Sequence, residues 1–165
     1  MAKLKREHVI FGASFDGEQW EALGKDNDDL SYELNPDTET AKNVLGETTV
    51  TFSGYEPELD MDPYYADPDR KLFTKLLEIS MMEKYAEEDV KGKFAKFYFD
   101  EDQKDKESMT GDAYVQDCLI VPQSIGGDTA ALGIPFNVMP MGAITKKKVT
   151  YKRADNSITV SEVGP

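Results

Sequence analysis

The sequence contains few of the residues on which enzymes and cross-linked domains depend. Among its 165 residues there is one cysteine, Cys118, and one histidine, His8. A single cysteine can form neither an internal disulfide nor a cysteine-based zinc site, so we expect Cys118 to be a small apolar residue in a reducing compartment. A single histidine near the start of the chain leaves a Ser-His-Asp or Cys-His site without a well-placed base, and we expect His8 to be a plain surface residue. The sequence therefore predicts no enzyme and no catalytic residues.

Long apolar runs and positive charges are also scarce. No stretch approaches the roughly 20 apolar residues of a membrane span, and residues 1–8 are basic and polar without a following hydrophobic run. We therefore expect a soluble chain without an export signal. The 32 acidic residues outnumber the 19 Lys and Arg residues, which gives a formal net charge of −13. Such an excess of negative charge disfavours specific binding to nucleic acid, because few cations are left to neutralise phosphates.

Patterns for phosphate and metal binding are incomplete. The Gly-Gly-Asp sequence at residues 126–128 lacks the lysine and the spacing of a phosphate-binding loop, and a turn explains it better. A calcium site is a more specific alternative, since Asp100, Glu101, Asp102 and Asp105 carry the oxygen ligands that this ion prefers. That segment has no glycine at the sixth loop position and no closing glutamate at the twelfth. We expect neither a cofactor nor a metal.

Alternating apolar residues predict a mainly β protein that forms one domain over residues 1–165. The expected strands cover residues 9–11, 47–54, 94–99, 112–121 and 132–138, followed by a terminal hairpin of residues 149–151 and 158–160. With one good helix, this indicates a small β-sandwich or barrel of six to seven strands and one flanking α-helix. Pro135 and Pro140 cannot donate to a ladder, so the strand that contains them is expected at an edge or with a bulge.

Residues 47–84 form one predicted unit of strand, corner and helix. In the strand, Val50 and Phe52 fall on one face and threonines on the other, which is typical of a half-buried strand. Proline, tyrosine and aspartate mark a corner over residues 54–67. Asp67 is the expected N-cap of a helix whose apolar face runs from Leu72 to Ile79.

A polar stretch precedes this unit. Residues 14–30 contain few apolar anchors, and together with residues 35–42 they predict a long loop or arm at about residues 14–42. Loops of this length in a compact domain usually have a function or are disordered. We expect the arm to reach a neighbouring molecule.

Seven residues are candidates for contacts between molecules. They are Trp20, Tyr55, Tyr64, Tyr65, Lys146, Lys147 and Lys148. The aromatic residues fit two interpretations equally: core fillers, or interface anchors that combine apolar area with a polar group. The three lysines either keep a sheet edge soluble or make salt contacts to an acidic neighbour.

Six short segments resemble, in order, segments of one known family. They are residues 31–36 (SYELNP), 43–46 (NVLG), 53–57 (SGYEP), 62–67 (DPYYAD), 123–128 (QSIGGD) and 134–137 (IPFN). The residues of these segments, and the order in which the segments occur, resemble those of the tail tube proteins, also called major tail proteins, of long-tailed bacteriophages. The similarity spans roughly residues 31–140 and does not extend to residues 1–29, 81–90 or 94–106.

The resemblance implies a structural protein of the virion tail that assembles in the host cytoplasm. Copies of the chain would form hexameric rings whose inner sheets join into one lumenal barrel, and the rings would stack into a tube. Double-stranded DNA would pass through at ejection without specific binding, because a negative lumen repels phosphates. The implied partners are the chain itself, the tape measure protein, the tail terminator and baseplate components, with no membrane. The closing of sheet edges by neighbouring subunits fits this role.

Two alternatives stay open from the sequence. The chain could be a solitary β-sandwich module that binds carbohydrate or another ligand through exposed aromatic residues, with or without calcium. It could also be the tube subunit of a phage-derived injection particle that carries no genome. A binding module stays monomeric at high concentration, whereas a tube subunit forms rings or filaments.

Overall fold

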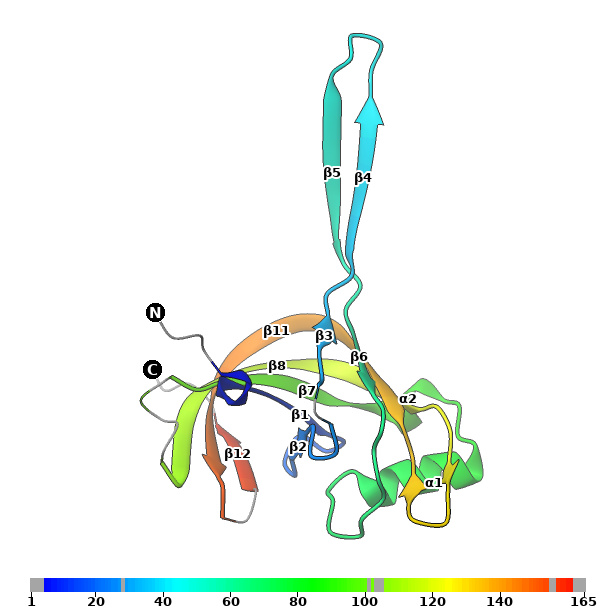
Figure 1. Ribbon diagram of the computed structural model, residues 1–165, viewed down its shortest axis with the longest axis vertical. Helices are drawn as coiled ribbons and strands as arrows, with labels where there is room; N and C mark the ends of the chain where they lie inside the picture. The colour runs from blue at the N-terminus through cyan, green and yellow to red at the C-terminus, as the bar shows by residue number, and fades with distance from the viewer. Residues whose placement is uncertain (1–4, 28, 101, 103–105, 155–156, 162–165) are drawn as a thin grey trace.

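The structure is a computed structural model that describes residues 5–27, 29–100, 102, 106–154 and 157–161. Its largest element is one antiparallel sheet with the strand order β2-β1-β7-β8-β11-β6-β3, and β12 pairs with the second half of β11 (Figure 1). The strands of this sheet are β1 (Val9–Ser14), β2 (Glu21–Leu23), β3 (Tyr32–Glu33), β6 (Glu58–Met61), β7 (Lys91–Tyr98), β8 (Ser108–Pro122), β11 (Phe136–Lys152) and β12 (Ser157–Ser161). The mainly β architecture with a flanking helix is therefore confirmed.

The strand count was underestimated. Two further two-stranded sheets, β4 (Pro36–Lys42) with β5 (Thr48–Tyr55) and β9 (Gly126–Gly127) with β10 (Leu132–Gly133), bring the described chain to twelve strands instead of six to seven. Several of the additional strands are only two to four residues long. Strands this short carry too little alternation to stand out in a sequence.

The sheet buries apolar side chains on both faces. Because side chains alternate along a strand, Phe94 of β7 and Ile120 of β8 contribute to one core, while Phe97 and Val115 contribute to the other. The first core is closed by β6 and the helix α1 (Phe73–Met82), and the second contains Trp20 and Ile158. Cys118 lies fully buried in the first core, as predicted, and burial raises the pKa of its thiol to about 12.

Strand β11 corrects the placement expected for the proline-containing strand. Instead of lying at an edge, it pairs with β8 on one side and with β6 and then β12 on the other. The alternative prediction of a bulge is confirmed, because the register shifts between Met141 and Thr145. Within the described residues, positions 139–147 have no strand partner on the β6–β12 side. Pro140 falls in this open stretch, in keeping with the preference of proline for unpaired edges.

The helix begins later than predicted. Its N-cap is Leu72, which has no side-chain capping bond, whereas Asp67 caps a preceding turn through a 3.0 Å bond from the Asp69 N–H. Pro68 and the residues after it complete this turn before the helix starts. The predicted apolar face is correct, since Leu76 and Ile79 are buried against the sheet. A second short helix, α2 (Glu87–Val90), leads into β7.

The start of the chain is packed more tightly than expected. His8 lies in a short 3₁₀ helix (Arg6–His8) and is buried, with its Nδ1 3.1 Å from the carbonyl oxygen of Phe99. The prediction of a surface histidine is therefore wrong, because the segment docks on the end of β7. No helix in the described part of the chain is long and apolar enough to cross a membrane.

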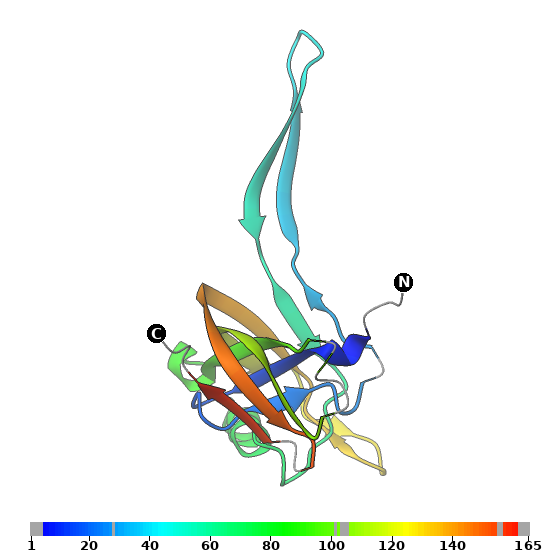
Figure 2. The same ribbon diagram turned by 90° about the vertical axis from the view of Figure 1, so that its left-hand side faces the viewer.

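Strands β4 and β5 form a hairpin that projects far from the rest of the molecule (Figures 1 and 2). The strand predicted over residues 47–54 exists as β5, but its predicted half-burial is wrong, because it pairs only with β4. The loop expected over residues 14–42 contains β2, β3 and β4, and the projecting arm extends instead over residues 36–55. The corner expected over residues 54–67 contains β6, which joins the main sheet.

Candidate assembly surfaces

One face of the β4–β5 hairpin is apolar and uncovered. Val50 and Phe52 point to this face and are 66% and 54% exposed. The register shift near the base of the hairpin brings Tyr55 to the same side, where its ring lies edge-on to Phe52 with 5.0 Å between centroids. On the other face, Thr49 and Thr51 lie opposite Ala41 and Glu39. On the face of Val50 and Phe52, β4 contributes Thr40 and Thr38, so the apolar side chains of this face come from β5 alone. Every residue of β4 is exposed.

The tip of the hairpin is held in a defined conformation. The side-chain Oδ1 of Asn43 accepts bonds from the N–H groups of Leu45 at 2.9 Å and Glu47 at 3.1 Å. Gly46 takes the positive φ of 80° that the turn requires. The turn presents Val44 and Leu45 to solvent, with exposed fractions of 102% and 78%. Two large apolar side chains are thus displayed on an ordered turn.

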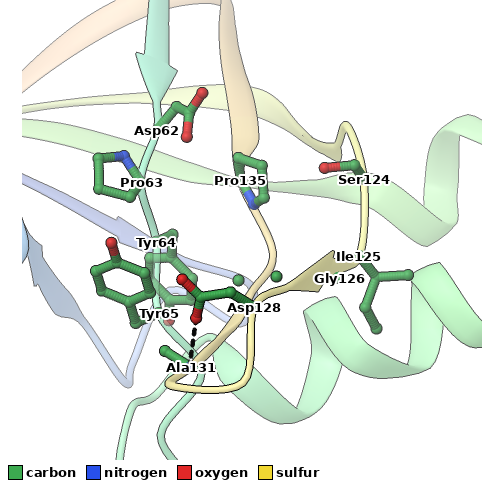
Figure 3. A pocket seen from close by; sticks show the side chains of 12 residues that line it. Asp62, Pro63, Tyr64, Tyr65, Ser124, Ile125, Gly126, Asp128, Ala131 and Pro135 are labelled. Carbon is green, nitrogen blue, oxygen red and sulfur yellow. Dashed lines mark hydrogen bonds between the residues drawn. The ribbon is translucent and has the colours of Figure 1, made fainter.

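A pocket of about 330 Å³ lies at the opposite end of the molecule, where residues 62–65 meet the β9–β10 hairpin (Figure 3). We call it the corner pocket; its walls are Asp62, Pro63, Tyr64, Tyr65, Ser124, Ile125, Gly126, Gly127, Asp128, Ala131, Gly133 and Pro135. Backbone bonds close it, with the Ile134 N–H donating to the Tyr64 carbonyl at 2.9 Å and the Ala66 N–H to the Leu132 carbonyl at 2.8 Å. Asp128 orders the β9–β10 turn by accepting bonds from the Ala130 and Ala131 N–H groups.

A buried ionic network supports the corner pocket from behind. Arg70 donates to the Asp26 carboxylate at 2.6 Å and to the Tyr65 carbonyl at 3.0 Å, and its guanidinium stacks 3.9 Å above the Tyr64 ring. Glu21 on β2 lies 3.3 Å from Arg70 and accepts the Tyr64 hydroxyl at 3.0 Å. The network joins β2, the corner and the turn that precedes α1, so it fixes the wall of the pocket.

Burial raises the pKa of Glu21 above its ordinary value of 4.5, although Arg70 opposes this effect. The folded chain therefore binds this proton more tightly than the unfolded chain, and the carboxyl reduces stability as the pH rises from 4.5 through its raised pKa. We expect Glu21→Gln to make the fall in unfolding free energy less steep over this window, measured by urea titration at several pH values. Identical slopes for the two proteins would show that Glu21 does not titrate differently on folding.

The structure separates the four aromatic candidates. Tyr64 is fully buried and Trp20 nearly so, and both pack in the cores, so the interface-anchor interpretation is wrong for these two. Tyr64 packs edge-on to Phe136 in the first core, and Trp20 packs edge-on to Phe97 in the second. Tyr55 at the base of the hairpin and Tyr65 at the corner pocket are about half exposed. These two remain candidates for contacts between molecules.

The three lysines lie at or beside the open stretch of β11. Lys148 and Lys146 approach the Asp112 carboxylate of β8, at 2.9 and 3.9 Å, and Lys147 is half-buried. Lys146 also lies 6.0 Å from the centre of the Tyr114 ring. Lysines at an unpaired edge discourage uncontrolled strand pairing. Their position is compatible with that protective role and with a salt contact to a neighbour.

Several exposed apolar residues were missed in the sequence. Val44 and Leu45 stand at the hairpin tip, and Ile125 and Leu132 border the β9–β10 hairpin. An apolar pair between an asparagine and a glycine, as in residues 43–46, is a signal that could have identified the tip. The rim of the corner pocket had no local signal, because residues 62–65 and 124–135 meet only in the folded chain.

Metal binding has no support among the described residues, which contain no group of three or more histidine, cysteine, aspartate or glutamate side chains that could hold an ion. Glu101 and Asp105, two of the four ligands considered for calcium, lie outside the described residues. No protein-family model matches the chain, and no curated protein matches it. The function is therefore inferred from the hairpin, the corner pocket and the sheet edges themselves.

Proposed function

We propose that the chain is a structural subunit of a bacteriophage tail tube, which associates with copies of itself into rings that stack into a tube. The observation that carries this proposal is the uncovered apolar face of the projecting hairpin, formed by Val50, Phe52 and Tyr55. A two-stranded hairpin is only marginally stable in water unless another surface covers its apolar face. Within one chain, β4 and β5 pair only with each other in the described structure. We therefore expect a neighbouring molecule to cover the apolar face of the hairpin.

The segments that resemble tail tube proteins coincide with these surfaces. Residues 31–36 and 53–57 lie at the base of the hairpin and residues 43–46 at its tip. Residues 62–67, 123–128 and 134–137 contribute walls of the corner pocket. Each of the six segments thus contributes residues to the hairpin, to its base or to the pocket walls. The tip of the β4–β5 hairpin and the β9–β10 hairpin lie at opposite ends of the molecule (Figure 1). This distribution supports self-association as a property that the chain shares with the tail tube proteins.

The remaining features fit the same role. The open stretch of β11 at residues 139–147 offers backbone groups that a neighbouring strand can pair with. The net charge of −13 keeps DNA from adhering to a tube built of many copies. In this proposal the tube stands in the virion tail, and DNA passes through it without specific contacts.

The proposal is tested by following the mass of the purified chain as its concentration rises. Sedimentation velocity is expected to show growth from monomers to rings and stacked rings, and negative-stain microscopy is expected to show tubes of uniform width. The hairpin face and sheet edges supply the association energy, so growth is expected to depend steeply on concentration. A chain that stays monomeric at the highest soluble concentration would contradict the proposal and favour a solitary binding module.

A further inference from the structure

We propose that the end of helix α1 in one copy docks on an uncovered part of the main sheet of the neighbouring copy in the same ring. This inference rests on the proposed self-association and names two surfaces that meet between subunits. The first, the lysine-tyrosine face, consists of Val9, Lys96, Tyr98, Tyr114, Ile144 and Lys146. The second, the helix-end patch, consists of Met81, Met82, Glu83, Tyr85, Glu87 and Glu88.

The lysine-tyrosine face continues the side of the sheet on which α1 and the first core lie. Phe94 of β7 belongs to the first core, and because side chains alternate along a strand, Lys96 and Tyr98 point to the same side. Lys96 is opposite Tyr114 of β8, which is opposite Lys146 of β11, so the three form a row across the sheet. Tyr98 and Lys146 are exposed, so the covering elements end before this part of the face.

A pocket of about 350 Å³ opens in this face, and Lys96 is the one charged residue among those that line it. The other walls are Val9, Phe97, Tyr98, Tyr114 and Ile144. The Lys96 ammonium lies 4.8 Å from the centre of the Tyr32 ring and makes no salt bridge with any other described residue. Partial burial lowers the pKa of Lys96. A half-buried ammonium group without a carboxylate, beside an apolar pocket, favours a partner that combines an acidic group with an apolar one.

The charge of this face is opposite to that of the whole chain. Two neighbouring rows of residues on it, 96, 114 and 146 and then 98, 112 and 148, contain three lysines and one aspartate. That aspartate, Asp112, already accepts a bond from Lys148 at 2.9 Å. Because the net charge of the chain is −13, other copies present mostly negative surfaces to these lysines. Charge therefore favours a second copy as the partner.

The helix-end patch displays large apolar side chains on an ordered turn. Met81 and Met82, the last residues of α1, are 68% and 69% exposed, and Tyr85 is 97% exposed. Glu83 ends the helix with a φ of 49°, and a backbone bond of 3.1 Å to the carbonyl of Ile79 closes the turn. Because the turn is formed before a partner arrives, little conformational entropy is lost on binding.

Acidic side chains surround these apolar residues. Glu83, Glu87 and Glu88 are exposed and make no salt bridge with any other described residue. Lys84, the one basic residue between positions 76 and 90, lies 2.6 Å from Glu78. The patch is therefore apolar at its centre and negative at its rim, whereas the lysine-tyrosine face has an apolar pocket beside lysines.

The two surfaces complement each other in two independent ways. Methionine is flexible, fills irregular pockets and makes favourable sulfur–aromatic contacts, so Met81 and Met82 suit a pocket walled by Tyr98 and Tyr114. The carboxylates of the patch and the lysines of the face attract one another and fix the orientation of the contact.

The contact has to form between two molecules, because the two surfaces lie at opposite ends of β7. The helix α2 leads directly into β7 at Lys91, whereas Tyr98 is the last residue of the strand. In Figure 1, α1 and α2 lie on the right of the sheet and β12 on the left, across the direction in which the hairpin projects. The contact therefore places copies side by side and not along the hairpin. Such a heterologous contact generates a ring when the rotation between copies closes.

The test exchanges charges between the two surfaces. Lys96→Glu with Lys146→Glu reverses the face, Glu83→Lys with Glu87→Lys reverses the patch, and a fourfold variant carries both pairs. We expect each pair alone to raise the concentration at which rings form in sedimentation velocity at least about tenfold, because like charges then meet. The fourfold variant is expected to form rings at nearly the wild-type concentration, since the attraction is restored with its sign reversed.

The sign of the charge change separates this contact from general repulsion. Each substitution changes the charge by two, so the lysine pair makes the chain more negative by four and the glutamate pair less negative by four. Repulsion between acidic chains predicts opposite effects of the two pairs on ring formation, whereas the proposed contact predicts a loss with both. Improved assembly of the glutamate pair would overturn the inference.

The apolar centre of the patch is tested separately. Met82→Asp is expected to reduce ring formation at least about tenfold. Thr74→Asp is the matched control, because Thr74 is exposed on the same helix about two turns earlier and lies outside the patch. Both positions are exposed, so both melting temperatures are expected to stay close to that of the wild type. Equal effects of the two variants on assembly would remove the patch from the contact.

A cross-link locates the contact directly. A chain with Met82→Cys and Tyr98→Cys is expected to form disulfide-linked oligomers on mild oxidation, because docking brings these positions of two copies together. Native Cys118 is buried and its raised pKa makes it unreactive, so it does not compete. A yield no higher than that of a chain with Thr74→Cys and Tyr98→Cys would contradict the placement of the helix end.

The wild type separates failure of the inference from failure of the proposed function. If the wild type forms rings and every charge variant forms them equally well, the inference fails and the proposed function stands. If the wild type stays monomeric, the proposed function fails, and the inference fails with it. If the lysine pair assembles normally but binds duplex DNA more weakly than the wild type at low salt, the face serves a polyanion and the inference fails.

Discussion

Aspartate at positions 50 and 52 is expected to abolish assembly while the chain remains folded. Val50→Asp with Phe52→Asp places two charges on the hairpin face that we propose a neighbour covers. Loss of a buried aromatic anchor such as Phe52 costs about 2 kcal/mol or more, and the burial of two carboxylates adds to this cost, so self-association is expected to weaken roughly 100-fold or more. The hairpin packs against neither core. The unfolding free energy is therefore expected to change by less than about 0.5 kcal/mol for each substitution.

The matched control for this variant is Thr49→Asp with Thr51→Asp. It adds the same two charges to the same strand, but on the polar face opposite Ala41 and Glu39. Sedimentation velocity on both variants separates the effect of charge from the effect of the face. Equal losses of assembly would attribute the defect to repulsion between acidic chains, and normal assembly of the first variant would remove the hairpin face from the interface.

Arg70→Met is expected to be the most destabilising single change in the corner. Arg70 and Glu21 are both buried, and their charged groups lie 3.3 Å apart. Removal of Arg70 leaves the Glu21 carboxylate buried without a cationic partner, and breaking a buried ion pair in this way typically costs about 3–5 kcal/mol. We expect a fall in melting temperature of roughly 6–20 °C, given the usual entropy of unfolding for a chain of this size. Urea titration and calorimetry measure the two quantities.

Two controls identify the cause of that loss. Lys71→Met removes a positive charge from the neighbouring exposed position and is expected to change stability little. Arg70→Met with Glu21→Gln leaves no ionised carboxylate on β2 and is expected to recover part of the lost stability, since an amide oxygen still accepts the Tyr64 hydroxyl. If the double variant is no more stable than Arg70→Met alone, the loss comes from packing over the Tyr64 ring and not from the unpaired charge.

Local patterns in the sequence predicted much of the fold. The strands at β1, β5, β7, β8 and the β11–β12 hairpin were each found near their predicted positions. The apolar stripe of α1 was also correct, because leucine and isoleucine at helical spacing fall on one face of a helix and bury it together. The start of that helix was wrong, since Asp67 caps a turn equally well and nothing local distinguishes the two uses.

The candidate assembly surfaces were predicted less well. Alternation marked Val50 and Phe52 as one apolar face, yet alternation alone does not say whether the chain itself or another molecule covers that face. Tyr64 and Tyr65 are neighbours with the same side-chain type, and one is fully buried while the other is about half exposed. The difference arises because Tyr64 packs on Phe136 and Tyr65 bridges to Gly133, contacts made by residues about 70 positions away.

The sequence alone determined the mainly β class, the apolar face of the one long helix, the apolar role of Cys118 and the acidic character of the chain. Each of these depends on composition or on residues a few positions apart. The folded chain was needed to show that one hairpin leaves the body, that residues 62–65 and 124–135 enclose a pocket, and that Arg70 is buried beside Glu21. These features depend on contacts between distant segments and on which faces remain uncovered. No local pattern encodes them, since a strand with the same alternating pattern can be covered by its own chain or by a neighbouring molecule.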